Sequence, residues 1–274
     1  MTAYPVVFHV GPLAITGFGL LMLAAFLVAG WLAALELRRL GFREDYASEM
    51  LGAAVIGGIV GAKLWYVALH GTDALFSRGG LVFYGGLLGG ALAVALNSLR
   101  LKVPLRWTMH LVASPLAAAY AVGRVGCFLV GDDYGGPTDL PWGVKFPEGF
   151  PPSTVASLAS MGVRVPAGLD PATVLAVHPT QLYETFSMLL VFAILWPLRR
   201  RTDKPVGWLF GLYLVFAGIE RFLVEILRAK DDRLLGMFTV AQLTSVLLVV
   251  AGAVVMTAWR GNPRVEPGPG LRPA

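Results

Sequence analysis

The sequence contains a single cysteine, Cys127, among 274 residues. An intrachain disulfide is therefore excluded, and cysteine usage does not identify the redox compartment. The four histidines are scattered without metal-ligand spacing. P-loop, dinucleotide-binding and nucleophile-elbow motifs are absent from the sequence. We therefore predict neither a metal nor a cofactor.

Charged residues are also scarce: they make up 14% of the chain, while 56% of the residues are hydrophobic. With a mean hydropathy of +0.69, this composition excludes an ordinary water-soluble domain and is typical of a polytopic membrane protein. The net charge of +5 does not indicate a nucleic-acid partner, because the basic residues lie in short loops between apolar runs. No basic region precedes the first run, which we interpret as a retained span rather than a signal peptide.

Seven apolar runs are long enough to cross a hydrocarbon core of roughly 30 Å. We therefore predict an all-α fold, a polytopic integral membrane protein with about seven transmembrane helices in one domain over residues 1–260. The runs cover residues 12–35, 47–69, 80–99, 107–130, 179–198, 206–228 and 235–259.

The basic residues in the connections predict the orientation. The segments after the first, third, fifth and seventh runs hold thirteen Lys and Arg residues, the other connections hold six, and the N-terminal flank holds none. By the positive-inside rule, the N-terminus lies outside and the C-terminus in the cytoplasm.

Two segments lie outside the apolar runs. Residues 132–177 form one long connection, rich in Pro and Gly, with a helical period only near residues 153–161. On the predicted orientation it faces outside, where a loop of this length is typical of a lid or a partner-binding element. Residues 261–274 end in Pro-Gly-Pro-Gly-Leu-Arg-Pro-Ala, and we predict a disordered cytoplasmic tail.

A few charged residues interrupt the apolar runs. An arginine at the centre of a spanning helix costs roughly 2.5 to 3.5 kcal/mol on insertion scales, so such a residue needs a partner or a function. On the predicted orientation all six of these charges fall in the outer half of the membrane, three positive and three negative, as pairing around a polar cavity requires. Arginines in such a cavity can hold a phosphate bidentately. The six residues are Lys63, Arg124, Glu184, Glu220, Arg221 and Glu225.

Each of these charges has an alternative interpretation as a structural ion pair or a snorkelling side chain. Six on one side, beside an Asp132-Asp133 turn, favour a functional cavity. Other polar candidates at this depth are His178, Gln181 and Tyr84. A lone histidine at a helix start is usually a cap or a surface group. The glycines of residues 83–90 more often serve close helix packing than ligand binding.

Four ordered motifs resemble those of the bacterial prolipoprotein diacylglyceryl transferase family. They agree in order, spacing and helix layout over most of the chain, and four ordered matches are far more specific than any one alone. The motifs are Gly123-Arg124-Val125-Gly126-Cys127-Phe128 through Gly131-Asp132-Asp133-Tyr134-Gly135, His178-Pro179-Thr180-Gln181-Leu182-Tyr183-Glu184, Arg221-Phe222-Leu223-Val224-Glu225 with Arg228, and Tyr84-Gly85-Gly86-Leu87-Leu88-Gly89.

This resemblance implies an integral enzyme of the bacterial cytoplasmic (inner) membrane, with its active site towards the outer leaflet. The family transfers the diacylglyceryl group of phosphatidylglycerol to the lipobox cysteine thiol of a prolipoprotein and releases glycerol phosphate. The implied partners are phosphatidylglycerol, a prolipoprotein signal peptide with its lipobox cysteine, and membrane lipids.

The resemblance also implies roles for individual residues. Arg124 and Arg221 would hold the headgroup phosphate, Glu225 and Asp132 would orient them or neutralise the site, and Gly135 would shape the turn. The predicted catalytic residues are Arg124, Arg221, Tyr84 and His178, and the predicted substrate-binding residues are Arg124, Arg221, Asp132, Gly135, Glu225, Gln181 and Glu184.

The chain departs from the family at several positions. The third-helix motif of the family often begins with His, proposed as the base, where this chain has Tyr84. A phenol is a poorer base at neutral pH than an imidazole, so the thiol proton could go to Tyr84, to His178 or to the phosphate. The alternatives to a transferase are a lipid transporter and a non-catalytic lipid-binding protein on the same scaffold.

Overall fold

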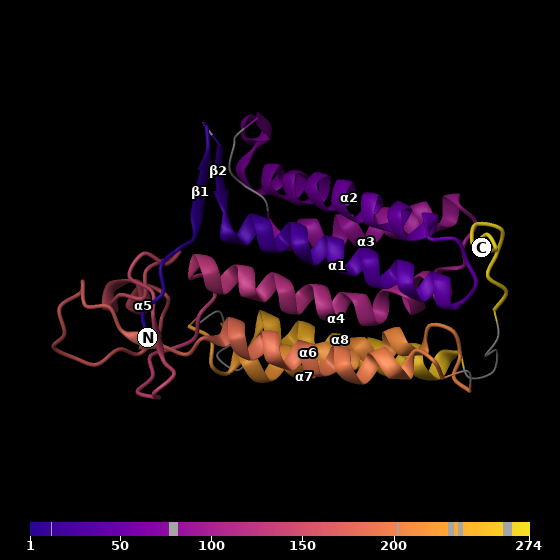
Figure 1. The fold of residues 1–274 in the computed structure, drawn as a ribbon. Helices are drawn as coiled ribbons and strands as arrows, with labels where there is room; N and C mark the ends of the chain where they lie inside the picture. Colours follow the sequence, from indigo (N-terminus) through magenta and orange to yellow (C-terminus); the bar gives the residue numbers. More distant parts are fainter. Residues whose placement is uncertain (12, 77–81, 202, 230–232, 235–237, 260–264) are drawn as a thin grey trace.

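Seven long α-helices run side by side in the computed structural model of the chain (Figure 1). The structure describes residues 1–11, 13–76, 82–201, 203–229, 233–234, 238–259 and 265–274. The long helices are α1 (Gly17–Arg39), α2 (Asp45–His70), α3 (Phe83–Arg100), α4 (Leu105–Val130), α6 (Thr180–Leu198), α7 (Trp208–Glu225) and α8 (Val240–Ala258).

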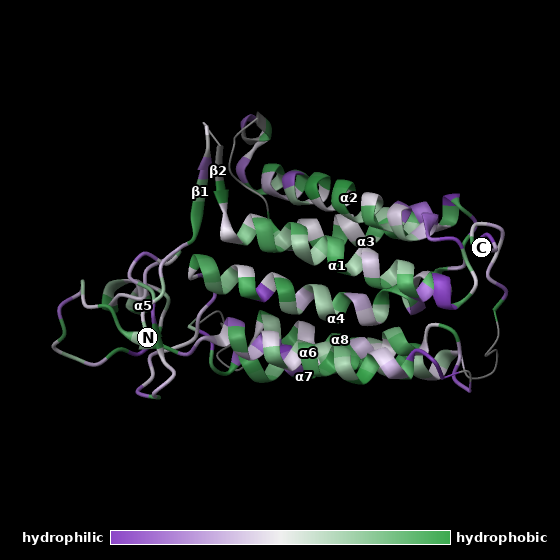
Figure 2. Cartoon of the chain, in the orientation of Figure 1, coloured by the Kyte–Doolittle hydropathy of each residue, from purple (hydrophilic) through white to green (hydrophobic). Residues whose placement is uncertain are grey.

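The surface of this bundle is apolar. Large side chains such as Leu23, Ile56 and Leu247 are more than half exposed, and Figure 2 shows hydrophobic colours along the helices, with hydrophilic colours gathered mainly at their ends. Such a surface suits lipid rather than water. Five helices, α1, α2, α4, α6 and α8, are long and apolar enough to cross a membrane. The structure thus agrees with a multi-pass helical membrane protein.

The first helix begins later than the sequence suggested. We expected the first run to start at residue 12, but β1 (Val7–Val10) and β2 (Leu13–Thr16) pair as an antiparallel hairpin before the helix. The Thr16 hydroxyl then caps α1 by accepting a hydrogen bond from the backbone N–H of Gly19 at 3.1 Å, as is typical of N-caps. The expected starts and ends of the later helices lie within a few residues of those observed.

Glycines bring α2 and α3 into close contact. A Cβ atom built on Gly61 would lie 2.3 Å from the carbonyl oxygen of Gly85, and one on Gly89 would lie 2.4 Å from that of Gly57. Both positions exclude any side chain. The expectation that the glycines of residues 83–90 serve helix packing is therefore confirmed.

The two ends of the bundle differ, and we name them after the segments that lie there. At the loop end, residues 132–177 form a small subdomain with β3 (Val144–Lys145) paired to β4 (Ala176–Val177), and the short helix α5 (Val155–Ser160) falls where the sequence predicted it. A short 3₁₀ helix, η1 (Thr72–Phe76), follows α2, and β5 (Arg233–Leu234) pairs with β6 (Phe238–Thr239) before α8. The N-terminus lies at the loop end and the C-terminus at the opposite, tail end (Figure 1).

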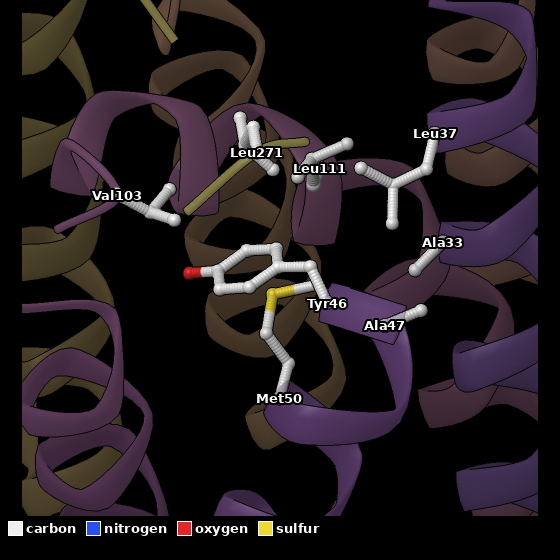
Figure 3. Packing of buried hydrophobic residues seen from close by; sticks show 8 residues of the cluster. All are labelled: Ala33, Leu37, Tyr46, Ala47, Met50, Val103, Leu111 and Leu271. Atoms are coloured by element: carbon white, nitrogen blue, oxygen red, sulfur yellow. The ribbon is translucent and has the colours of Figure 1, made fainter. Parts of the chain in front are cut away.

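The C-terminal tail is ordered where it is described, which corrects our expectation. Leu271 is 4% exposed and packs with Leu37, Tyr46, Val103 and Leu111 (Figure 3). The backbone is also held, because the N–H of the last residue donates to the Gly41 carbonyl at 2.9 Å. The prediction of a disordered tail over residues 261–274 is therefore wrong for residues 265–274. The reason is that the Leu271 side chain is buried in the core cluster at this end of the bundle. Residues 261–264, and the basic residues Arg78, Lys230, Arg260 and Arg264, lie outside the described residues.

Candidate functional site

The candidate site lies at the loop end, where the chain turns after α4. Gly131 ends this helix in the left-handed conformation, with φ of 68°, which suits glycine. The following residues then pass between two helices. The N–H of Gly135 donates to the His178 carbonyl at 2.8 Å, and the N–H of Gly136 donates to the Leu227 carbonyl at 2.8 Å. The turn is thereby fixed to the start of α6 and to the residues just after α7.

Gly135 leaves no space for a side chain. A Cβ atom there would lie 2.5 Å from the Leu227 carbonyl oxygen and 2.8 Å from the His178 Cβ. Such distances require the backbone to shift, so only glycine fits this turn. The neighbouring Gly136 has room, because the nearest atom to its Cβ, on Val163, is 3.9 Å away.

Glu184 bridges the arginines of two other helices. Its side chain, on α6, is buried and forms an ion pair with Nη2 of Arg124 on α4. Its Oε1 lies 3.6 Å from Nη1 of Arg221 on α7 and accepts a hydrogen bond from the Tyr120 hydroxyl at 3.1 Å. One buried carboxylate therefore bridges α4, α6 and α7.

Further ion pairs extend this group towards the turn. Arg124 Nη1 donates to Asp133 Oδ2 at 3.0 Å, and Asp133 also pairs with Arg228. Arg221 Nη2 lies 2.6 Å from Glu225 Oε2, and Arg228 Nε lies 3.9 Å from the same oxygen. We name the set of Arg124, Asp133, Glu184, Arg221, Glu225 and Arg228 the loop-end cluster.

Two guanidinium nitrogens of this cluster make no hydrogen bond within the described residues. Arg124 is 8% exposed, and neither its Nε nor Nη1 of Arg221 has a hydrogen-bond partner among the described residues. An unsatisfied buried donor carries the full cost of losing water. The site can therefore accept an oxyanion at modest cost, and a phosphate offers several acceptor oxygens at once.

The two aspartates of the turn differ in their charge environment. Burial and the neighbouring Asp133 raise the pKa of Asp132 to about 6. Burial by itself would raise the pKa of Asp133 as well, but Arg228 and Arg124 outweigh it and lower the pKa. Asp133 is thus a permanent anion of the cluster, whereas Asp132 titrates near neutral pH.

The start of α6 holds the turn through its polar side chains. The Gln181 amide is fully buried and donates to the backbone carbonyl of Asp132, and the Thr180 hydroxyl donates to the carbonyl of Asp133 at 2.7 Å. The His178 Nδ1 lies 3.3 Å from the Tyr183 hydroxyl. Burial lowers the pKa of His178, so its imidazole is neutral at pH 7.

The structure does not bring every predicted residue into this group. Tyr84 begins α3, is 48% exposed and packs edge-on against Phe83. No hydrogen bond or ion pair of the described residues joins Tyr84 to the loop-end cluster. Lys63 lies on α2 with its amine over the Tyr66 ring, 5.4 Å from the ring centroid. Two hollows, of about 550 and 320 Å³, lie along α2 and α3 and are lined by none of the cluster residues.

One group of side chains has donor atoms close enough to share a metal ion. Cys127, Asp132 and Asp133 place these atoms within 4.8 Å of one another. However, Arg124 Nη1 lies 3.3 Å from the Cys127 sulfur and also pairs with Asp133. A guanidinium at this position repels a cation, and it already balances the charge of Asp133.

The sequence analysis assigned no role to three members of the site, Tyr120, Asp133 and Arg228. Tyr120 lies four residues before Arg124, so the two share a helix face. That spacing was a signal for its position but not for its hydrogen bond to Glu184. Asp133 and Arg228 were noticed in the motifs, but their mutual ion pair joins residues 95 positions apart.

Comparison with known proteins gives a consistent result. Residues 5–258 match the family described as prolipoprotein diacylglyceryl transferase. Relatives named phosphatidylglycerol–prolipoprotein diacylglyceryl transferase include one from Clostridium tetani (strain Massachusetts / E88), 32% identical over 92% of this chain and 96% of the relative. Another is from Cupriavidus metallidurans, 32% identical over 94% of each chain. A third, from Pseudoalteromonas atlantica, is 30% identical over 96% of this chain and 92% of the relative.

Proposed function

The chain belongs to the prolipoprotein diacylglyceryl transferase family, and from this premise we propose that it transfers the diacylglyceryl group of phosphatidylglycerol to the lipobox cysteine thiol of a prolipoprotein. Glycerol phosphate is the second product. The observation that carries the proposal is the pair of arginines, Arg124 and Arg221, which share Glu184 and have buried nitrogens without a hydrogen-bond partner among the described residues.

The reaction needs a nucleophile and a stabilised leaving group. The thiol sulfur attacks the glyceryl carbon that bears the phosphate, and the carbon–oxygen bond breaks with its electron pair passing to the phosphate. Arg124 and Arg221 bind the phosphate and stabilise the charge that develops on it, which is preorganised electrostatic catalysis. The nucleophile belongs to the substrate, so Cys127 has no covalent role.

The other predicted residues support this clamp. Glu184 and Glu225 fix the guanidinium groups, Gln181 and Gly135 fix the turn, and Asp132 lies beside the clamp. Tyr84 and His178 stay predictions as catalytic residues.

We assign the protein to the bacterial cytoplasmic membrane with seven spans, the N-terminus and the site facing the outer leaflet. Support comes from the two termini, which lie at opposite ends of the bundle (Figure 1), as an odd number of crossings requires. The basic residues that follow α1, α3 and α6 lie at the tail end, which suits a cytoplasmic face. On this assignment α3 and α7 also cross, and the charges of α7 are buried against α4 and α6.

The test follows transfer from phosphatidylglycerol to a lipobox peptide by the purified protein in detergent. We expect Arg124→Ala and Arg221→Ala each to lower kcat by about 10²- to 10³-fold, because each removes a donor to the developing charge. The matched control is Arg38→Ala, which removes an exposed arginine paired with Glu44 at the tail end. Full activity of correctly inserted Arg124→Ala would reject the phosphate clamp, and absence of product with the wild-type protein would reject the transferase itself.

A further inference from the structure

The proposed transfer requires a group that takes the thiol proton, because the thiolate is the nucleophilic form of cysteine. Tyr84 is not joined to the loop-end cluster by any contact of the described residues, as shown above. The His178 Nδ1 lies within 3.3 Å of the Tyr183 hydroxyl, which itself accepts a hydrogen bond from Trp142 at 2.8 Å. The search for an acceptor therefore turns to the carboxylates around the clamp.

Most of these carboxylates already hold an arginine. Asp133 pairs with Arg124 and Arg228, Glu184 pairs with Arg124, and Glu225 pairs with Arg221. A guanidinium stabilises the ionised form of its partner and so makes it a weak proton acceptor.

Among the carboxyl groups around the clamp, two form no ion pair with the described residues. They are Glu220 and Asp132. Glu220 is 7% exposed and lies on α7 among the helices. Asp132 lies in the turn beyond α4 and is only partly buried. Position therefore favours Asp132 as the group that meets the substrate.

The turn holds Asp132 firmly while one of its carboxylate oxygens stays available. Its backbone carbonyl accepts the Gln181 amide, whereas Oδ1 is buried and has no hydrogen-bond partner among the described residues. The groups that face the carboxylate are Asp133, Arg124 and Cys127 near the turn and Arg228 from beyond α7. The two arginines already pair with Asp133, so Oδ1 is the unused acceptor next to the clamp.

We propose that Asp132 is the general base of this chain and accepts the proton of the lipobox thiol; the inference rests on the proposed function. The S–H proton passes to the carboxylate of Asp132, and the sulfur electron pair forms the bond to the glyceryl carbon. The carbon–oxygen bond breaks towards the phosphate, which leaves as glycerol phosphate against Arg124 and Arg221. Asp132 then releases its proton to water.

The titration of Asp132 agrees with this role. Its pKa of about 6 keeps it ionised at pH 7 but makes it a stronger base than an ordinary carboxylate. As the pH falls through that value, Asp132 becomes protonated and can no longer accept a proton. We therefore expect kcat/KM to fall on the acid side with a midpoint near this pKa.

The experiment compares Asp132→Asn with Asp139→Asn, the same change at an exposed position of the same loop. We expect Asp132→Asn to lower transfer to a lipobox peptide by about 10²- to 10⁴-fold. Its acid-side fall should move up towards the ordinary pKa of a cysteine thiol, about 8.5, because only the ionised substrate then reacts. Asp139→Asn should keep the rate and the midpoint of the wild type. Asp132→Glu should recover part of the activity. Phosphatidylglycerol should still raise the Tm of Asp132→Asn, because Arg124 and Arg221 are intact.

A second substrate separates base catalysis from a structural effect. A lipobox peptide with selenocysteine in place of cysteine is ionised at neutral pH and needs no base. We expect Asp132→Asn to regain most of its activity with this peptide. If Asp132→Asn keeps the acid-side midpoint of the wild type near 6, or if Tyr84→Phe or His178→Asn is the variant rescued by selenocysteine, the assignment is overturned although the wild-type protein remains a transferase. A wild-type protein without transfer would instead overturn the proposed function, and this assignment with it.

Discussion

The bundle carries a buried ionic cluster at each end, and the two clusters differ in what they leave unpaired. At the tail end, Glu36 on α1 is 2% exposed. It accepts two hydrogen bonds from Arg39, at 2.9 and 2.6 Å, and one from Arg199 at 2.8 Å. Nε2 of His110 on α4 lies 3.6 Å from the same carboxylate. Both of its oxygens are therefore used within the protein.

The loop-end cluster has more charges, and fewer of their polar atoms form hydrogen bonds. Its carboxylates pair with Arg124, Arg221 and Arg228, yet Nε of Arg124 and Nη1 of Arg221 form no hydrogen bond among the described residues. A buried ion pair repays its desolvation only if the remaining donors and acceptors are also satisfied. Glu36 meets this condition, although Nδ1 of His110 beside it has no hydrogen-bond partner among the described residues. The loop-end cluster leaves both guanidinium nitrogens and carboxylate oxygens without hydrogen bonds, which fits the phosphate clamp proposed above.

The largest effect that would test this comparison is expected from Glu184→Gln. The substitution removes the charge shared by Arg124 and Arg221 and leaves both guanidinium groups misplaced. We expect the rate of transfer to fall by about 100-fold or more, as for the loss of an oriented donor. The measurement is the rate of transfer to a lipobox peptide by the variant purified in detergent. A variant with normal transfer would show that the bridge is only structural.

The matching change at the tail end is Glu36→Gln. Removing one partner of a buried ion pair costs about 3–5 kcal/mol, so we expect a lower Tm in detergent. Transfer per folded molecule should stay near that of the wild type, because Glu36 lies far from the turn. A loss of turnover larger than the loss of folded protein would make the tail end part of the catalytic machinery.

A smaller effect is expected from Leu271→Ala in the docked tail. The side chain is buried among Leu37, Tyr46 and Val103 (Figure 3), and Leu→Ala in a core costs about 2 kcal/mol or more. The measurement is Tm, with the exposed Arg272→Ala as the control at the adjacent position. Equal stability of the two variants would contradict the docking of the tail.

The smallest effect on stability is expected from Gly135→Ala, compared with Gly136→Ala. Only the first introduces a Cβ within 2.5 Å of the Leu227 carbonyl oxygen, and such overpacking costs about 1–3 kcal/mol. Because the turn carries Asp132 and Asp133, transfer should also fall in Gly135→Ala and remain in Gly136→Ala. An equal loss of stability and of transfer in both variants would contradict this prediction, because it would show that the space at the Cβ position does not decide the effect.

Much of this arrangement was readable in the sequence because its signals are local. Apolar runs predicted the helices, the glycines of residues 83–90 predicted close packing, and Arg124, Glu184 and Arg221 stood out as charges in apolar surroundings. The misses are of another kind. The docked tail depends on contacts between segments far apart in the sequence, because Leu271 lies in the same buried cluster as Leu37. The β1–β2 hairpin is local, but hydropathy alone assigned its second strand to the first helix. Composition alone suggested disorder for the tail because it contains a single large apolar side chain.

The sequence by itself determined the membrane-spanning class of the protein, its family motifs and which charges had to be explained, because hydropathy and the cost of a buried charge act residue by residue. Only the tertiary structure decided which charges meet. Arg124 and Arg221 lie 97 positions apart and share one carboxylate because α4, α6 and α7 pack together. The structure also distinguished Asp132 from Asp133, because only Asp133 forms ion pairs with Arg124 and Arg228 among the described residues.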